Sequence, residues 1–340
     1  MKKFVRILAL VIALSMLAFV FVACDDKAQE PDTNTDGVQD DNTNTPDDNT
    51  NDNTNDSTNG DGATTEDESD PNEVKIVILA GQSNAVGVGH TKHLEDHFSK
   101  AKVMEYKVGY ENVKINYSSH GKVSNGFVNT TINCTQVGKD TFGPELGMAE
   151  IFSAEQPEKS VYIVKCAFGA TNLSHDWLSP SGEKTVDSTD DQTGWCYDEL
   201  IKILGESIEM LEAQGYNPRI HGFCWMQGES DAGDANDVNK YITRYRLLLK
   251  DLTKEFEGYF DENCDFVDAG ISQTWMFYDR MNKIKKDFAE DNENYHYVDT
   301  IKEGLTVLNE PHGAVDPYHY DSDSVIKLGQ LFAKSIDFND

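Results

Sequence analysis

The sequence predicts a three-layer α/β/α domain with a mainly parallel sheet over residues 73–340. Short β-branched apolar runs alternate there with longer amphipathic stretches, as in domains whose helices cover both faces of a parallel sheet. The 340-residue chain is 38% hydrophobic and 26% charged, which is an ordinary globular composition. Two segments of different composition precede this domain.

Residues 1–24 have the composition of an export signal. Three basic residues lead into a 17-residue apolar run at 7–23, interrupted by one serine, and this order is typical of secretory signals. The run ends in FVAC at 21–24, which resembles the lipobox of bacterial lipoproteins. The resemblance implies cleavage before Cys24 and lipidation of that cysteine, which anchors the chain to the outside of the bacterial cell membrane. The alternative is an uncleaved anchor helix, and both interpretations are extracytoplasmic.

Residues 25–72 are predicted to be a disordered tether. They are built mainly from Asp, Asn and Thr, with sixteen acidic residues and one lysine. Too few apolar side chains are present to offset the backbone entropy lost on folding. A flexible chain of this length spans roughly 35–40 Å root-mean-square.

The net charge restricts the partners. The whole chain carries −31, made up of +3 in residues 1–24, −15 in the tether and −19 in residues 73–340. This surplus of carboxylates repels phosphate, so a nucleic-acid partner is excluded, and a neutral substrate is favoured over an anionic one.

Five apolar runs are predicted as strands, because short β-branched runs are typical of buried strands. They lie at 74–80, 161–167, 219–226, 265–271 and 295–298.

Three amphipathic stretches are predicted as helices from the spacing of their apolar residues. They lie at 195–215, 238–256 and 324–336. The segment 103–140 is richer in Gly, Asn and Lys and is expected to be an irregular insertion or extra hairpins.

In parallel sheets the functional site lies at the carboxyl ends of the strands, and two polar segments follow predicted strands, while a third precedes the last predicted helix. The first predicted strand ends in GQSN at 81–84. A serine on a tight strand-to-helix turn is presented as a nucleophile, although this turn alone favours an ordinary turn with a capping serine. WMQGESD follows at 225–231, and DPYHY at 316–320 precedes the last helix. Asp316 and His319 are close enough in sequence to face one serine together.

Taken together, these segments resemble the SGNH/GDSL hydrolase superfamily, in particular its branch of sialate O-acetylesterases and acetylxylan esterases (carbohydrate esterase family six). The resemblance implies a flavodoxin-like SGNH fold and one domain over 73–340. The matching blocks are GQSN at 81–84, GPELG at 143–147, KCAFGATNL at 165–173 followed by Trp177, WMQGESD at 225–231, and DPYH at 316–319 followed by LG at 328–329.

The resemblance also implies the catalytic roles. Ser83 is the nucleophile, His319 the base and then the acid, and Asp316 the residue that orients His319. The oxyanion hole combines the backbone N–H groups of Ser83 and Gly169 with the side-chain amide of Gln227. No metal or organic cofactor is implied.

One departure from the family pattern concerns the oxyanion hole. Ala170 stands where many members have a second glycine, which leaves open whether Gly169 or Ala170 supplies the amide.

Other polar residues of the blocks are expected to support the site. Asn84 follows the nucleophile, and Glu229 and Asp231 lie in the third block. The two carboxylates also look like a glycosidase pair, but their place inside a motif favours a supporting role.

The spacing of His90, His93 and His97 is compatible with a metal site on a helix, but a solvated helix is the favoured interpretation. Trp177, Trp225 and Trp275 are candidates for stacking on sugar rings. Trp225 is expected in the core, and Trp177 is the better candidate for the rim.

Five cysteines follow Cys24. Cys166 and Cys224 lie in apolar strands and are expected to be buried thiols. The sequence allows one disulfide among Cys134, Cys196 and Cys264 but does not assign the pair.

The function expected from these observations is a serine carbohydrate O-acetylesterase that acts on acetylated polysaccharide of the xylan type. The first alternative is a sialate O-acetylesterase. The second is a non-catalytic carbohydrate-binding protein on the same fold, which the presence of Ser83, Gln227, Asp316 and His319 together disfavours.

Overall fold

The computed structural model describes residues 70–134, 140–307, 310–312 and 316–338. The predicted export signal and nearly all of the predicted tether lie outside these residues. Within them, no helix has both the length and the apolar character needed to cross a membrane.

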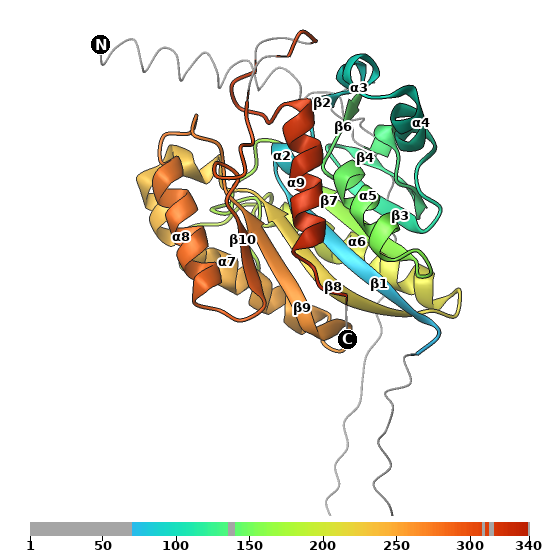
Figure 1. The fold of residues 1–340 in the computed structure, drawn as a ribbon. Helices are drawn as coiled ribbons and strands as arrows, with labels where there is room; N and C mark the ends of the chain where they lie inside the picture. The colour runs from blue at the N-terminus through green and yellow to red at the C-terminus, as the bar shows by residue number, and fades with distance from the viewer. Residues whose placement is uncertain (1–69, 135–139, 308–309, 313–315, 339–340) are drawn as a thin grey trace, which may run out of the picture. The chain divides into compact units, whose positions relative to one another are not determined.

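The described residues form one large, mainly parallel sheet (Figure 1) in the order β10-β9-β8-β1-β7-β3-β4, with β5 also paired to β3. Only β4 and β5 run antiparallel to their neighbour β3. The strands are β1 (Glu73–Gly81), β3 (Val113–Ser119), β4 (Lys122–Val123), β5 (Val128–Asn129), β7 (Val161–Ala167), β8 (Asn217–Met226), β9 (Phe260–Ala269) and β10 (Tyr295–Val298). A separate antiparallel pair joins β2 (Gly89–His90) to β6 (Thr141–Phe142).

Helices cover both faces of the sheet, so the predicted three-layer fold is confirmed. In Figure 1, α5 and α9 lie in front of the sheet, and α6 and α7 lie behind it, with α8 beside α7 and β10. The helices are α2 (Ser83–Val86), α3 (Thr91–His97), α4 (Lys100–Val108), α5 (Glu145–Glu155), α6 (Trp195–Glu212), α7 (Ala235–Glu255), α8 (Tyr278–Glu290) and α9 (Ser322–Lys334).

The five predicted strands and three predicted helices are all present, with ends shifted by a few residues. The expectation for residues 103–140 is wrong in one respect, because this segment contains the parallel strand β3. Its polar residues are buried and paired across the layer: Asn116 donates to Ser207 Oγ at 2.8 Å, and Ser118 donates to Glu199 at 2.7 Å. Polar residues satisfied in this way are indistinguishable in sequence from residues of an exposed hairpin.

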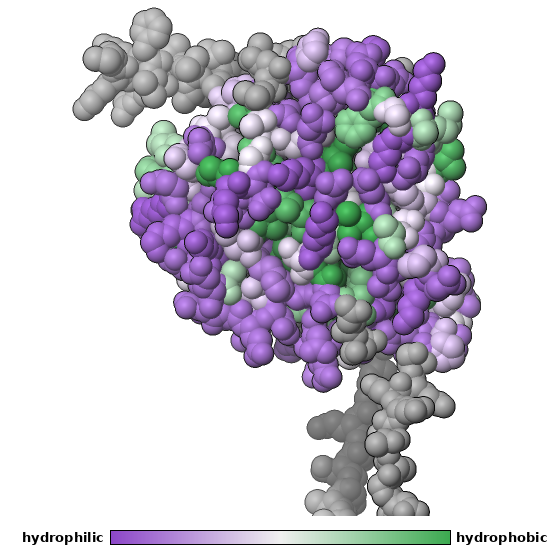
Figure 2. All heavy atoms as spheres, viewed as in Figure 1, coloured by the Kyte–Doolittle hydropathy of each residue, from purple (hydrophilic) through white to green (hydrophobic). Residues whose placement is uncertain are grey.

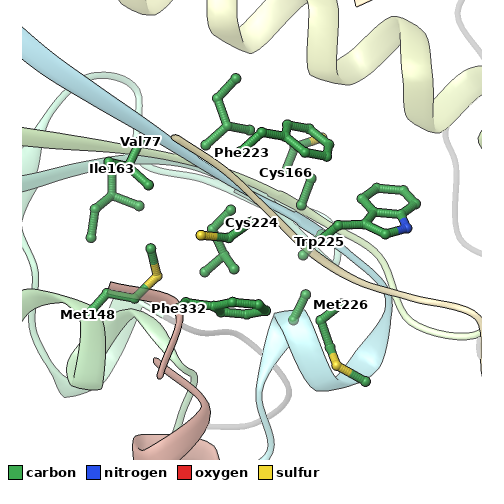
Figure 3. Packing of buried hydrophobic residues seen from close by; sticks show 14 of the residues in the cluster. Val77, Met148, Ile163, Cys166, Phe223, Cys224, Trp225, Met226 and Phe332 are labelled. Atoms are coloured by element: carbon green, nitrogen blue, oxygen red, sulfur yellow. The ribbon is translucent and has the colours of Figure 1, made fainter. Parts of the chain in front are cut away.

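The core fills the space on both sides of the sheet (Figure 3). Cys224 of β8 faces Met148 of α5 and Phe332 of α9, whereas its neighbours Phe223 and Trp225 point to the opposite side. Each large side chain buried in this way contributes about 1.5–3 kcal/mol relative to exposure. Trp225 is fully buried, as predicted.

The prediction that Trp177 lies at the rim of the site is wrong. Trp177 is fully buried, packs edge-on against Trp225 with ring centroids 4.9 Å apart, and donates from Nε1 to Thr171 Oγ1. It therefore anchors the loop after β7 in the core.

The cysteines of the described residues are all buried and free. The buried thiols predicted at Cys166 and Cys224 are confirmed, and burial raises the pKa of both. The open question of a disulfide is answered in the negative for Cys134, Cys196 and Cys264.

Candidate active site

The nucleophile turn is created by a close contact between the ends of β1 and β8. A Cβ on Gly81 would lie 2.0 Å from the carbonyl oxygen of Met226, and Gly81 has a φ of 139°. Only glycine fits such a contact. The next residue, Gln82, donates its backbone N–H to the same carbonyl at 2.9 Å. Ser83 then begins α2 directly at the carboxyl edge of the sheet.

A buried ion pair supports α2 from below. Lys165 of β7 donates to Glu145 of α5 and to the carbonyl of Val86, each at 2.7 Å, and the side chains of the ion pair are fully buried. Sequence reasoning assigned no role to Lys165 or Glu145. The signal was present, because a lysine inside the apolar run of β7 requires a buried partner.

Asn84 connects the nucleophile turn to two other segments. Its Nδ2 donates to Glu229 Oε1 at 2.8 Å, and its Oδ1 accepts the backbone N–H of Tyr320 at 2.9 Å. Tyr320 directly follows His319. The Asn84 side chain therefore connects the turn of Ser83 to two other loops, the one after β8 and the one that carries His319.

Asp316 and His319 form the pair that the sequence predicts. Asp316 Oδ2 lies 2.6 Å from His319 Nδ1, and Asp316 Oδ1 accepts the backbone N–H groups of Tyr318 and His319. Partial burial acts to raise the pKa of Asp316, but these hydrogen bonds outweigh it and lower the pKa below its usual value. The carboxylate therefore stays ionised and holds Nδ1 of the imidazole, which directs Nε2 away from Asp316.

The glycine predicted for the oxyanion hole lies next to the nucleophile. A Cβ built on Gly169 would lie 3.7 Å from Ser83 Cβ. The following residue, Ala170, has a φ of 61°. This left-handed conformation explains why glycine suits the position, since it costs other residues roughly 1–2 kcal/mol.

Gln227 lies beneath the nucleophile turn. Its side chain is fully buried, and its Nε2 donates to Asp231 Oδ2 at 2.6 Å and to Gln82 Oε1 and the carbonyl of Thr171, both at 3.2 Å. A carboxamide has two N–H hydrogens, and three acceptors already surround them. The geometry therefore does not support the predicted contribution of this amide to the oxyanion hole.

Glu229 and Asp231 are both buried. Asp231 also accepts the backbone N–H of Leu173 at 3.0 Å and so links the loops after β7 and β8. Burial raises the pKa of Glu229, against the opposing hydrogen bond from Asn84. Burial likewise raises the pKa of Asp231 to about 6.

Helix α3 is exposed at most of its positions, as the solvated-helix interpretation expects, but one of the three histidines at 90–97 is buried. His93 is buried and stacks on His97 with ring centroids 4.2 Å apart, whereas His90 precedes the helix. Across the described ranges, no group of three His, Cys, Asp or Glu side chains has the geometry of a metal site.

An aromatic pair lies beside the predicted base. The rings of Trp275, in the loop after β9, and Tyr318, in the loop of His319, have centroids 5.3 Å apart. Tyr318 is 37% exposed. Sequence reasoning included Trp275 among three tryptophans but had no means to place it next to Tyr318.

The family model of the carbohydrate esterases called sialic acid-specific acetylesterases (SASA) matches residues 73–337. The chain belongs to this family. It is accordingly a carboxylic ester hydrolase of the carbohydrate acetylesterase type, as the sequence predicts.

Two solved structures are similar to this carbohydrate esterase in fold. A protein of Arabidopsis thaliana is 18% identical with a TM-score of 0.53, and the match covers 78% of this chain and 98% of that one. NanS is 14% identical with a TM-score of 0.53, covering 78% and 97%. No match was found among curated protein sequences.

Proposed function

We propose that this esterase removes acetyl groups from an acetylated neutral polysaccharide of the xylan type by a Ser-His-Asp mechanism. The observation that carries the proposal is the Asp316–His319 pair, 2.6 Å apart, on a loop that Asn84 fastens to the turn of Ser83.

The mechanism begins with Ser83 Oγ, which attacks the acetyl carbonyl carbon while His319 Nε2 takes its proton. The backbone N–H groups of Ser83 and Gly169 donate hydrogen bonds to the developing oxyanion, and one such donor is worth roughly 10²–10³ in rate. His319 then protonates the sugar oxygen, which leaves as a hydroxyl group. Water, deprotonated by His319, hydrolyses the acetyl-serine to acetate and free Ser83. Asp316 stabilises the imidazolium in both halves.

The aromatic pair supports a carbohydrate as the leaving group. Trp275 and the exposed Tyr318 lie on the side of His319, which is the side where the leaving sugar receives its proton. Rigid aromatic faces pack well against the C–H faces of a pyranose ring.

The charge distribution supports a neutral sugar over a sialic acid. Residues 73–340 carry −19, and Figure 2 shows a predominantly hydrophilic face. The net negative charge repels a sialate carboxylate. A sialate O-acetylesterase, the activity after which the family is named, is the second candidate.

Acetate release from acetylated xylan and from O-acetylated sialic acid, measured side by side, tests the proposal. We expect the full chain to favour xylan and Ser83→Ala to lose activity by at least about 10⁴-fold, because the triad acts as a unit. Preference for sialic acid would contradict the substrate, and full activity of Ser83→Ala would contradict the mechanism. Absence of acetate release from both substrates by the wild type would contradict the proposed function.

We also propose that the chain is attached to the outer face of the bacterial cell membrane through lipid on Cys24. The basic start, the apolar run and the FVAC sequence support this location. A charged, flexible segment at 25–72 would allow the esterase to reach an external polymer.

A further inference from the structure

His120 has a feature that the mechanism does not use. It lies in the turn between β3 and β4 with a φ of 47°, followed by Gly121 with a φ of 82°. A histidine in the left-handed region is uncommon, and such conformations persist only where surrounding contacts hold them. Here the backbone N–H of His120 donates to the carbonyl of Ala167 at 3.1 Å, which fixes the turn against the end of β7.

This turn places the imidazole beside the nucleophile. A Cβ built on Gly169 would lie 3.5 Å from both Nδ1 and Cε1 of His120 and 3.7 Å from Ser83 Cβ. These are ordinary van der Waals separations on both sides. The missing side chain of Gly169 therefore leaves a gap of about one methyl group between Ser83 and His120.

The sheet order decides which part of an ester lies in that gap. β1, whose carboxyl end leads to Ser83, has β8 and β9 on one side and β7 and β3 on the other. The loop of His319 is fixed to the β9 side, because Tyr320 Oη donates to the carbonyl of Gly270 and Tyr318 packs on Trp275. His319 must protonate the leaving oxygen, so the alcohol lies on the β9 side. The acyl group therefore lies on the β7 side, where Gly169 and His120 are found.

We propose that His120 closes the acyl side of the site and restricts the acyl group to acetyl, with the acetyl methyl between Ser83 and the imidazole above Gly169. This inference rests on the proposed esterase function and extends it to the residue that selects the acyl group. A longer acyl chain would collide with the imidazole, whereas acetyl fills the gap.

Substitution of His120 tests this directly with p-nitrophenyl acetate, propionate and butyrate, which share one leaving group. In the full chain carrying His120→Gly, we expect the butyrate-to-acetate ratio of kcat/KM to rise by about tenfold or more, since one methylene changes selectivity by roughly 10–200-fold. Gly accepts the left-handed backbone, as does the second variant, His120→Asn. Lys122→Ala, in the same exposed hairpin, is the matched control and should keep the wild-type ratio.

A side chain added at Gly169 should narrow the gap between Ser83 and His120. In Gly169→Ala the added methyl occupies the proposed acetyl position, so we expect the acetate-to-formate ratio of kcat/KM to fall by about tenfold or more, because formate lacks the methyl. Damage to the oxyanion amide alone would slow both esters equally and leave that ratio unchanged. His120→Gly added to Gly169→Ala should restore part of the acetate activity.

Failure of this inference differs from failure of the proposed function. If wild type hydrolyses acetate in a Ser83-dependent way but the acyl ratios are unchanged in both His120 variants and in Gly169→Ala, His120 does not select the acyl group. If wild type shows no Ser83-dependent hydrolysis of any ester, the proposed function is overturned, and this inference with it.

Discussion

Ser83 illustrates what one residue's surroundings add to a motif. Considered alone, the GQSN turn favoured a capping serine, but the N-cap position of α2 is Gln82, and Ser83 is the first helical residue. The capping interpretation is therefore wrong, because no side chain caps the start of α2 and Ser83 does not occupy the N-cap position. Gly81 makes this geometry available, because the contact with Met226 leaves no room for a Cβ.

The buried carboxyl group of Asp231 should make the stability of the protein depend on pH. Burial raises its pKa from 3.8 to about 6, so the folded protein holds this proton more tightly than the unfolded chain. Between these values stability falls as pH rises, because the folded state keeps a proton that the unfolded state has lost, so folding must take up a proton from an increasingly dilute supply. Asp231→Asn removes this proton, so the stability of wild type relative to the variant should fall from pH 4 to pH 6.5 by on the order of 2 kcal/mol.

Urea denaturation across this pH range measures the difference. Asp191→Asn, at an exposed carboxyl group, is the control for loss of a charge. A wild-type-to-variant difference that does not change with pH would show that Asp231 is ionised equally in both states.

At the scale of the elements, α5 and α9 touch through their backbones. A Cβ on Gly329 would lie 1.8 Å from the carbonyl oxygen of Pro144, and one on Gly147 would lie 2.0 Å from that of Ile326. These glycines belong to the GPELG and LG blocks, so both blocks mark one helix–helix contact. The loop of His319 leads directly into α9, and this contact therefore helps to set the position of the catalytic pair.

Gly329→Ala should force the two helices apart. We expect the free energy of unfolding to fall by about 1–3 kcal/mol or more, the usual cost of overpacking, with a loss of kcat as the loop of His319 shifts. Gly205→Ala in α6 is the matched control, because its nearest atom lies 3.9 Å from the added Cβ. It should stabilise the helix by up to about 1 kcal/mol. If urea denaturation gave the same change in the free energy of unfolding for Gly329→Ala and Gly205→Ala, the close contact between α5 and α9 would be contradicted.

At the scale of the whole molecule, the net charge of −31 is the sum of +3 over residues 1–24, −15 over residues 25–72 and −19 over residues 73–340. The −15 of residues 25–72 belongs to the proposed tether, whereas the −19 of residues 73–340 surrounds the esterase site and favours a neutral substrate. The proposed anchor at Cys24 would hold this acidic domain at the cell surface.

The anchor is tested by expressing the full chain in bacteria with labelled palmitate. We expect label in the protein and release from membranes only by detergent, because several acyl chains bind far more firmly than one. Cys24→Ser should lose the label. A variant that stays on the membrane without label would indicate an uncleaved anchor helix, and a wild type found free of membranes would contradict both forms of attachment.

The sequence by itself determined the features that depend on residues near one another in the chain. Apolar periodicity identified the strands that flank Ser83, and the spacing of Asp316 and His319 predicted their pairing, because a hydrogen bond within one loop needs no knowledge of the rest of the fold. Ordered blocks then led to the family.

Only the tertiary structure decided the contacts made across the sheet. It buried Trp177, surrounded the amide of Gln227 with acceptors, and placed His120 against Gly169 and Trp275 against Tyr318. These partners lie on different strands and loops, and their approach depends on strand order and helix packing. The burial of a polar residue such as Asn116 likewise depends on a partner that its own segment does not contain.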